Sequence, residues 1–292
     1  MTTYDSTLAT NPRDAAEWSR GRVVRVNLRA VFGRAYPRII GLTREPSWLF
    51  FEIFLPFLAV SAFVFVYRAL DAPEEYIGFV VVGGAMTAFW LNVVWMMAAQ
   101  FYWEKDQGNL ELYFSAPMHL MSILAGMAIG GLVMTSSRAL AVIAIGSLLY
   151  GVTYDIQQPW LLVAVFFMTM IPLYGLGMLF ASLFLMWGRE ANHFAELLQE
   201  PIYFLGGVNF PLAAIGPIAG LMIATLPLAV GLDAMRQLVF AGSENTTGVL
   251  PVGTEIAILA VMGVVFIVGA RIALKHLEHL ARREGRLTLR WQ

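Results

Sequence analysis

Long apolar runs follow one another along most of this 292-residue chain, and they constrain its fold more than any other feature. A helix that crosses the hydrocarbon core of a bilayer needs about 20 mostly apolar residues. Six runs meet that requirement: Trp48 to Tyr67, Tyr76 to Phe101, Leu120 to Tyr150, Trp160 to Trp187, Phe194 to Pro211 and Val252 to Leu274. Because backbone groups in lipid must be satisfied within their own segment, we expect six transmembrane helices and an all-α integral membrane fold.

Composition supports the same interpretation. The chain is 59% hydrophobic and 13% charged, whereas a soluble domain carries about 25% charged residues. A surface with so few charges is typical of a protein whose main solvent is the bilayer. Cysteine is absent, which excludes disulfides, thiolate nucleophiles and cysteine metal sites.

The distribution of basic residues predicts the orientation of the chain. Eight arginines lie in residues 1–47, and six more basic residues follow from Arg271 onward. With six spans, sixteen of the 19 basic residues fall on one side, which the positive-inside rule makes the cytoplasm. We therefore expect an inner (plasma) membrane protein with a cytoplasmic N-terminal region at 1–47, a transmembrane domain at 48–275 and a cytoplasmic basic tail at 276–292.

Residues 22–40 predict an amphipathic helix that lies in the membrane interface rather than crossing it. Its apolar face holds Val24, Leu28, Val31 and Phe32. Its basic face holds Arg22, Arg25 and Arg29. Gly33 and Pro37 are expected to bend the helix before the first span. The helix either anchors the chain to anionic lipid or also contacts a cytoplasmic partner.

Residues 102–117 lie between the second and third spans and predict a short helix that lies flat on the cytoplasmic surface. Four acidic or small residues step by four, three and four positions and so share one face. They are Glu104, Gly108, Glu111 and Ser115. Tyr113 lies on an aromatic face expected to meet lipid, and Pro117 ends the helix. The acidic face favours a partner; the alternative is an ordinary solvated loop.

The chain lacks the motifs of common enzymes. Its two lysines, Lys105 and Lys275, are not in a G-K-[ST] context, so the sequence contains no phosphate-binding P-loop. Its histidines, at 119, 193, 276 and 279, are not accompanied by an evident set of metal ligands. We expect no catalytic residue, no metal and no cofactor in this chain.

Residues 206–240 form an apolar segment that prolines at 211, 217 and 227 interrupt. Such a segment predicts short re-entrant helices that pack against the bundle between spans five and six. Gly207, Asn209, Phe210 and Pro211 are candidate residues of an outer gate. The alternative is a kinked connector without a gating role.

Two charged residues fall within predicted spans. An ionisable side chain in the membrane marks a functional pathway unless it is paired. Glu52 lies one turn into the first span, within expected reach of Arg44 or Arg38. Arg138 lies mid-way along the third span and needs an acid, a carbonyl or water beside it. Both residues are candidates for a substrate path, with structural pairing as the alternative.

Two motifs resemble a known family. Residues 104–111, EKDQGNLE, followed by Ser115-Ala116-Pro117, are similar to the E-x-x-x-G-x-L-E…P signature of ABC-2-type transporter permeases, which include daunorubicin-resistance-like exporters. Residues 206–211, GGVNFP, with Leu226-Pro227-Leu228 and Asp233-Ala234-Met235-Arg236, resemble the family's GxxFP…P…EA-R region. Asn209 and Asp233 depart from the residues usual there.

The resemblance implies a function and partners. It implies a homodimer, or a pair with a sister permease, that carries two ATP-binding cassette subunits, with ATP and Mg on those subunits. Stretch 102–117 then corresponds to the coupling helix and 22–40 to the connecting helix. The expected activity is export of a hydrophobic drug, lipid or lipid-linked molecule by alternating access. Alternatives are an ion-coupled secondary transporter, which would want inverted repeats, and an intramembrane lipid enzyme.

Overall fold

The computed structural model describes most of the chain. The described ranges are 20–44, 46–100, 118–187, 206–212, 225–242 and 248–284, with single positions at 103, 104, 107, 108, 112, 113, 116, 193, 197 and 216. Within them, the regular structure is helical apart from one isolated β-bridge between Asp155 and Phe240. The predicted all-α fold is confirmed.

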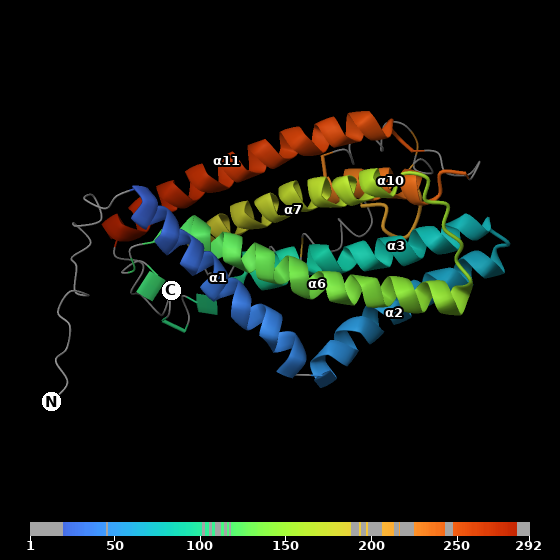
Figure 1. Cartoon of the computed structure of the whole chain (residues 1–292), viewed down its shortest axis with the longest axis horizontal. Helices are drawn as coiled ribbons and strands as arrows, with labels where there is room; N and C mark the ends of the chain where they lie inside the picture. Colours follow the sequence, from blue (N-terminus) through green and yellow to red (C-terminus); the bar gives the residue numbers. More distant parts are fainter. Residues whose placement is uncertain are drawn as a thin grey trace.

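The helices follow the chain in the order shown in Figure 1. They are α1 (Arg20–Arg44), α2 (Pro46–Ala69), α3 (Glu74–Leu91), η3 (Asn92–Ala98), α6 (Leu120–Tyr150), α7 (Pro159–Trp187), α10 (Pro227–Val239) and α11 (Val252–Glu284). The element η3 is a π-helix that continues α3 without a break.

Five helices of the described ranges are long and apolar enough to cross a membrane. They comprise Leu49–Ala69, Glu74–Ala98, Leu120–Tyr150, Pro159–Leu183 and Val252–His276. These agree within a few residues with five of the six predicted spans. The other predicted span, 194–211, lies mostly outside the described residues, so the count of six stays a prediction. Its predicted end does not hold for the described residues, because residues 206–210 form turns and bends and Gly207 has a left-handed φ of 60°.

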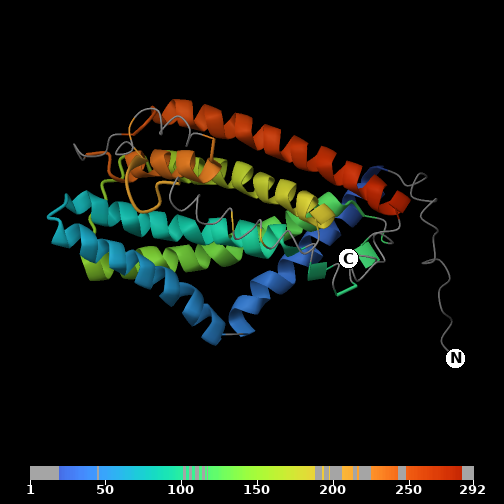
Figure 2. The ribbon, with the colours of Figure 1, turned by 180° about the vertical axis from the view of Figure 1, so that it is seen from behind.

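The continuous helix α3–η3 forms the centre of the bundle. In its most apolar window 89% of the residues are buried, against 17% in α2 and in α11. It packs against α2, α6, α7 and α10. The helix α11 runs along α7 on one side of the bundle, and α1 runs along α6 on the other (Figures 1 and 2). The exposed apolar side chains of α2 and α11 suit contact with lipid.

The helix α1 runs as one element through Gly33 and Pro37, so the predicted change of direction occurs later. The chain turns where α1 ends at Arg44 and α2 begins at Pro46, and the two helices form a V (Figures 1 and 2). The N-terminal end of α1 and the C-terminal end of α11 lie at the same end of the molecule in both views. The connections from α2 to α3 and from α6 to α7 lie at the other end.

The helix α1 packs closely on α6, a contact that an interfacial location alone does not require. Two glycines four residues apart on α6 allow the approach. A Cβ added at Gly126 would lie 2.5 Å from the Val31 carbonyl oxygen, and one at Gly130 would lie 3.0 Å from that of Ala35. At each glycine, the backbone of α1 occupies the space that a side chain on α6 would otherwise fill.

This contact predicts opposite effects for the same substitution at two helical glycines. Gly126→Ala should lower the free energy of unfolding by about 1–3 kcal/mol, because its Cβ meets backbone that cannot move aside. Gly33→Ala is the matched control, since nothing lies within 4 Å of its Cβ. It should raise stability by up to about 1 kcal/mol through helix propensity. Melting temperatures in detergent would measure both, and equal shifts would contradict the close contact.

Candidate functional site

A buried ion pair joins α1 to the stretch that follows η3. The Arg34 guanidinium pairs with the carboxylate of Glu104, whose residue is 4% exposed. Glu104 also accepts a hydrogen bond from Gln100 Nε2 at 2.8 Å. The prediction that Glu104 faces water on a docking surface is therefore wrong in this structure. The reason is electrostatic: a buried carboxylate needs a cation, and α1 supplies one.

Tyr113 approaches the same ion pair from the other side. The Arg34 guanidinium lies over the Tyr113 ring, 5.9 Å from its centroid, and the phenol hydrogen-bonds to Glu104. Burial raises the pKa of Tyr113, so its hydroxyl stays protonated and donates to the carboxylate. The predicted separation of an aromatic lipid-facing side from an acidic water-facing side does not hold for these two residues.

The stretch 102–117 is not one helix. Helical hydrogen bonds join Gln107 N–H to the Trp103 carbonyl at 3.0 Å and Ala116 N–H to the Leu112 carbonyl at 3.1 Å. Between them, Gly108 has a φ of 77° and lies in a turn. That left-handed conformation interrupts the helix predicted over 103–116 and accounts for a glycine at this position. The predicted coupling residues Glu111, Ser115 and Pro117 lie outside the described residues.

Arg38 fixes α1 one turn further along. It donates hydrogen bonds to the Met96 carbonyl in η3, to Gln100 Oε1 at 3.3 Å and to the Met127 carbonyl in α6 at 3.5 Å. Burial, and then the charge of Arg34, lowers the pKa of Arg38 to about 10, which leaves it protonated at neutral pH. The four-residue spacing of Arg34 and Arg38 was the only sequence signal for this role.

Asn27 provides a further attachment of α1, at the beginning of α6. Its Oδ1 accepts hydrogen bonds from His119 N–H and from Ser122 Oγ, both at 2.9 Å. Because these donors belong to the first turn of α6, Asn27 satisfies a helix end that α6 does not cap itself. The helix α1 is thus fixed to α6 and to the end of η3 by polar contacts along its length.

The other two faces of α1 point away from the bundle. Arg22, Arg25 and Arg29 are exposed, as predicted for the basic face. The exposed apolar row is Val24, Leu28, Phe32 and Tyr36. Val31, predicted to belong to the apolar row, lies against α6 instead. The side of α1 away from α6 is therefore amphipathic and open.

At the opposite end, Arg236 of α10 binds four backbone carbonyl groups. Its Nη1 donates to Gly207 at 2.6 Å and to Phe210 at 3.2 Å, and its Nη2 donates to Val208 and to Phe79, each at 2.7 Å. The residue is 2% exposed. From the sequence, Arg236 was expected only as a member of the second motif, without a role of its own. Its place in the second motif was the signal that it has a structural role.

The candidate gate residues form the loop that Arg236 holds. The Asn209 carbonyl accepts a hydrogen bond from the Tyr67 hydroxyl of α2 at 2.7 Å, and Pro211 is buried. A Cβ added at Gly83 of α3 would lie 1.9 Å from the Val208 carbonyl oxygen, so the loop rests directly on α3. The predicted packing of this segment against the bundle is confirmed for the described residues.

The helix α10 is 13 residues long, too short to cross a bilayer, and its polar residues connect it to α11 and to the segment just before α11. Asp233 Oδ2 accepts from Val249 N–H at 2.8 Å. Gln237 Nε2 donates to Glu255 Oε2 at 3.1 Å and to the Leu250 carbonyl at 2.9 Å. Glu255 was not among the predicted functional residues, although an acidic residue in the first turn of an apolar span could have indicated it.

The two charged residues predicted separately within the spans form an ion pair with each other. The Glu52 carboxylate pairs with the Arg138 guanidinium, joining α2 to α6. The predicted partners of Glu52, Arg44 and Arg38, are wrong, since Arg38 is held by η3 and α6. The pair lines a cavity of about 660 Å³ that Asn92 and Asn209 also reach.

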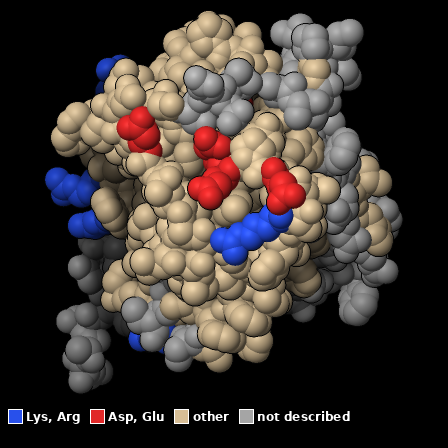
Figure 3. All heavy atoms as spheres, turned by 90° about the vertical axis from the view of Figure 1, so that its right-hand side faces the viewer, with Lys and Arg blue, Asp and Glu red and all other residues tan. Residues whose placement is uncertain are grey.

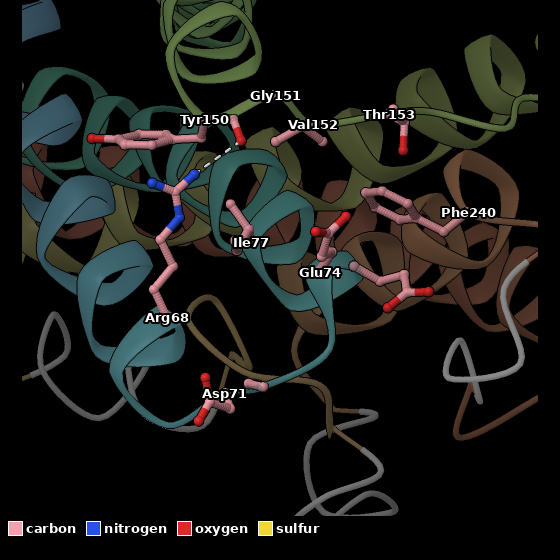
Figure 4. A pocket seen from close by; sticks show the side chains of 11 residues that line it. Arg68, Asp71, Glu74, Ile77, Tyr150, Gly151, Val152, Thr153 and Phe240 are labelled. Carbon is pink, nitrogen blue, oxygen red and sulfur yellow. Dashed lines mark hydrogen bonds between the residues drawn. The ribbon is translucent and has the colours of Figure 1, made fainter.

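Acidic residues gather at the end of the molecule remote from the basic face of α1 (Figure 3). A cavity of about 400 Å³ opens there, lined by Arg68, Asp71, Glu74 and Phe240 among others (Figure 4). Arg68 donates a hydrogen bond to the Tyr150 carbonyl at 3.2 Å, and its guanidinium lies over the Tyr150 ring, 5.6 Å from the ring centroid. Among the described residues, this acidic end and the basic face of α1 therefore lie apart.

Comparison with known proteins adds one match. A family model described as ABC-2 type transporter matches residues 37–240. The matched segment runs from the last turns of α1 to the residue after α10, and it includes both motif regions. No curated protein matches the chain in sequence.

Proposed function

This chain belongs to the ABC-2 type transporter family and is a multi-pass permease subunit, and from that premise we propose that it exports an apolar cargo with energy from a separate ATPase. The family match over residues 37–240 carries this proposal. The cargo is a hydrophobic drug, lipid or lipid-linked molecule. The narrower resemblance to daunorubicin-resistance-like exporters stays a prediction.

The proposed complex contains two permease subunits, either identical or sister chains, and two ATP-binding cassette subunits. ATP and Mg bind to the ATPase subunits, and this chain contributes no catalytic group. The docking surface consists of the open side of α1 and the exposed described positions of 102–117, which include Trp103 and Leu112. The Arg34–Glu104 pair supports this placement, because it joins both parts into one unit.

The proposed transmission begins at that unit. ATP-driven closure of the partner subunits moves α1, and the attachments through Asn27 and Arg38 pass the movement to α6 and η3. The ATPase state then biases a bundle with inward-open and outward-open arrangements, as alternating access requires. At the other end, the loop held by Arg236 acts as the outer gate.

The proposed orientation follows the charges. The exposed arginines of α1 face the cytoplasm, and the acidic end faces outward, as the positive-inside rule favours. The N-terminal end of α1 and the C-terminal end of α11 lie at the same end of the bundle, and this supports cytoplasmic termini in an inner (plasma) membrane. An ion-coupled carrier without an ATPase is the rival, and family membership favours the ATP-driven complex.

Reconstitution tests the proposal. The chain would be purified with a candidate ATP-binding cassette protein from the same organism and placed in proteoliposomes loaded with a panel of fluorescent apolar compounds. We expect efflux of at least one compound that needs ATP and stops when the ATPase lysine of the P-loop is replaced. Efflux by the permease alone, driven by an ion gradient, would contradict the proposal and support the secondary carrier.

A further inference from the structure

The central helix changes its hydrogen-bond register where it passes α1. At the start of η3, the Asn92 N–H bonds to the Ala88 carbonyl, four residues back, as in an α-helix. At the end of η3, the Ala99 N–H bonds to the Val94 carbonyl, five residues back, at 3.3 Å. Beyond it, the Trp103 N–H bonds to the Ala99 carbonyl, again four residues back, at 3.2 Å. The element η3 is therefore a π-helical insertion between parts with α-helical bonding, and such insertions are rare and often lie at functional sites.

Polar side chains from two other helices hold this insertion. Near its start, the Tyr174 hydroxyl of α7 donates a hydrogen bond to Asn92 Oδ1 at 3.2 Å, and both residues are buried. Near its end, the Arg38 guanidinium of α1 donates to the Met96 carbonyl and to Gln100 Oε1, the latter at 3.3 Å. The helix α1 thus binds the backbone of the π-helical turn itself, so a displacement of α1 acts directly on that turn.

Glycines of the neighbouring helices leave space beside η3. A Cβ added at Gly177 of α7 would lie 2.7 Å from Val93 Cγ1 and 3.1 Å from Met97 Sδ. A Cβ added at Gly131 of α6 would overlap the side-chain amide of Asn92. Both neighbours therefore present backbone rather than side chains to η3. A turn that is surrounded in this way can change its register without displacing bulky groups.

From these observations we propose that η3 is a register switch, which Arg38 holds in the π-helical form and which closes into an α-helical turn when α1 is displaced. The change is one residue of register, and one residue of an α-helix corresponds to a rotation of about 100° and a rise of about 1.5 Å. The part beyond η3 turns by that amount relative to α3, which carries Glu104 away from Arg34. The inference deepens the proposed function, and it rests on that function only in taking the ATPase as the source of the displacement.

Deletion of single residues tests the register of η3 on the purified full chain. Removing the half-buried Met96 shortens η3 to a length that α-helical bonds bridge, and the other side chains of the helix keep their faces. Its melting temperature in detergent should fall by less than about 8 °C. Removing Val81 from α3 instead turns Phe89 and Trp90, both 1% exposed, about 100° out of their packing, so little folded protein should accumulate. Losses of the same size in both variants would overturn the proposal.

Spin labels follow the rotation in the chain without an ATPase. Because the chain has no cysteine, Trp103→Cys beyond η3 and Leu140→Cys on α6 give a unique pair of exposed labelling sites. Arg38→Met removes the contact with the π-helical turn and should shift the distance between the labels by about 5–8 Å. In the chain that lacks Met96, which is α-helical already, Arg38→Met should leave the distance unchanged. No shift in the full-length chain, or the same shift in both chains, would overturn the switch.

ATP-driven efflux shows whether transport uses the switch. The chain that lacks Met96 has only one of the two states, so its efflux in proteoliposomes with the ATPase should fall at least about tenfold. Met96→Leu is the matched control, because it changes the side chain and keeps the length of η3, and its efflux should equal that of the wild type. Efflux at the wild-type rate from the deletion variant would overturn the switch and leave the transport proposal standing. A wild type that shows no ATP-driven efflux, together with the expected label shift, would count against the transport proposal alone.

Discussion

Replacing Glu104 by arginine is expected to abolish ATP-driven transport and to lower the free energy of unfolding by about 3 kcal/mol. The substitution places two cations at a buried position where Arg34 now meets a carboxylate. Removing one partner of a buried pair leaves an uncompensated charge, and such losses reach 3–5 kcal/mol. Because Arg34 is partly exposed, the lower end applies. Melting temperature in detergent and efflux in proteoliposomes would measure the two effects.

The exchanged pair provides the control for this prediction. In the Arg34→Glu, Glu104→Arg double variant, opposite charges again face each other, so both stability and transport should recover in part. Arg29→Glu makes the same charge change as Arg34→Glu, but at an exposed position of α1. It should change stability by less than about 0.5 kcal/mol. If the double variant behaves no better than Glu104→Arg alone, the pair does not join α1 to the coupling region.

The second large effect is expected at Arg236. Arg236→Met removes the donors of four buried hydrogen bonds and leaves four carbonyl groups facing an apolar side chain. Hydrogen bonds to charged groups contribute about 1.5–3 kcal/mol each, so the loss should exceed about 4 kcal/mol even with relaxation. We expect little folded protein to accumulate, and rapid proteolysis of the 206–212 loop in what does.

Arg236→Lys separates charge from geometry in the same position. Lysine keeps the positive charge but lacks the planar fork that lets arginine reach carbonyls from α3 and from the loop together. It should give an intermediate melting temperature and an intermediate rate of loop cleavage. If Arg236→Met has the same melting temperature as the wild type, the loop is held by packing alone.

One helix connects the two parts of the account. The glycines of α6 at 126 and 130 contact α1, and its Arg138 pairs with Glu52 at the cavity. A Cβ at Gly131 would lie 2.3 Å from Asn92 Oδ1, so the same helix also touches the residue that begins η3. In the proposed cycle, a displacement of α1 would reach α6 through the backbone contacts at Gly126 and Gly130, and would reach the cavity through the side chains of Arg138 and Asn92. This arrangement makes α6 an element that would carry movement from the docking surface to the cavity.

The spans were predictable from sequence because each is defined locally by length and hydropathy. The exact helix ends were harder to predict, because the left-handed Gly151 ends α6 whereas other glycines of the sequence lie within helices. The basic and apolar sides of α1 were also predictable from helical spacing. The glycine pair on α6 was a readable signal for close helix packing, although a spacing of four does not name the partner.

The pairings were not predictable, because they join residues far apart in the chain. Arg34 lies 70 residues from Glu104, whereas sequence reasoning placed Glu104 in water and assigned Glu52 to nearby arginines. Which of several arginines meets which acid depends on how the helices are arranged. Arg236 illustrates the same point, since its place in a sequence motif did not reveal that it binds four carbonyl groups inside the bundle.

Crosslinking from Leu112 tests most directly whether this chain receives energy from a separate ATPase at the end where α1 begins. Leu112 is 67% exposed within the 102–117 stretch, and a cysteine there is unique in the chain. With a thiol-directed photocrosslinker in inverted membrane vesicles, Leu112→Cys should give a product that contains a P-loop ATPase, and Ala72→Cys at the acidic end should not. A position 112 that crosslinks to no nucleotide-hydrolysing protein, or that an impermeant reagent labels in intact cells, would contradict the account.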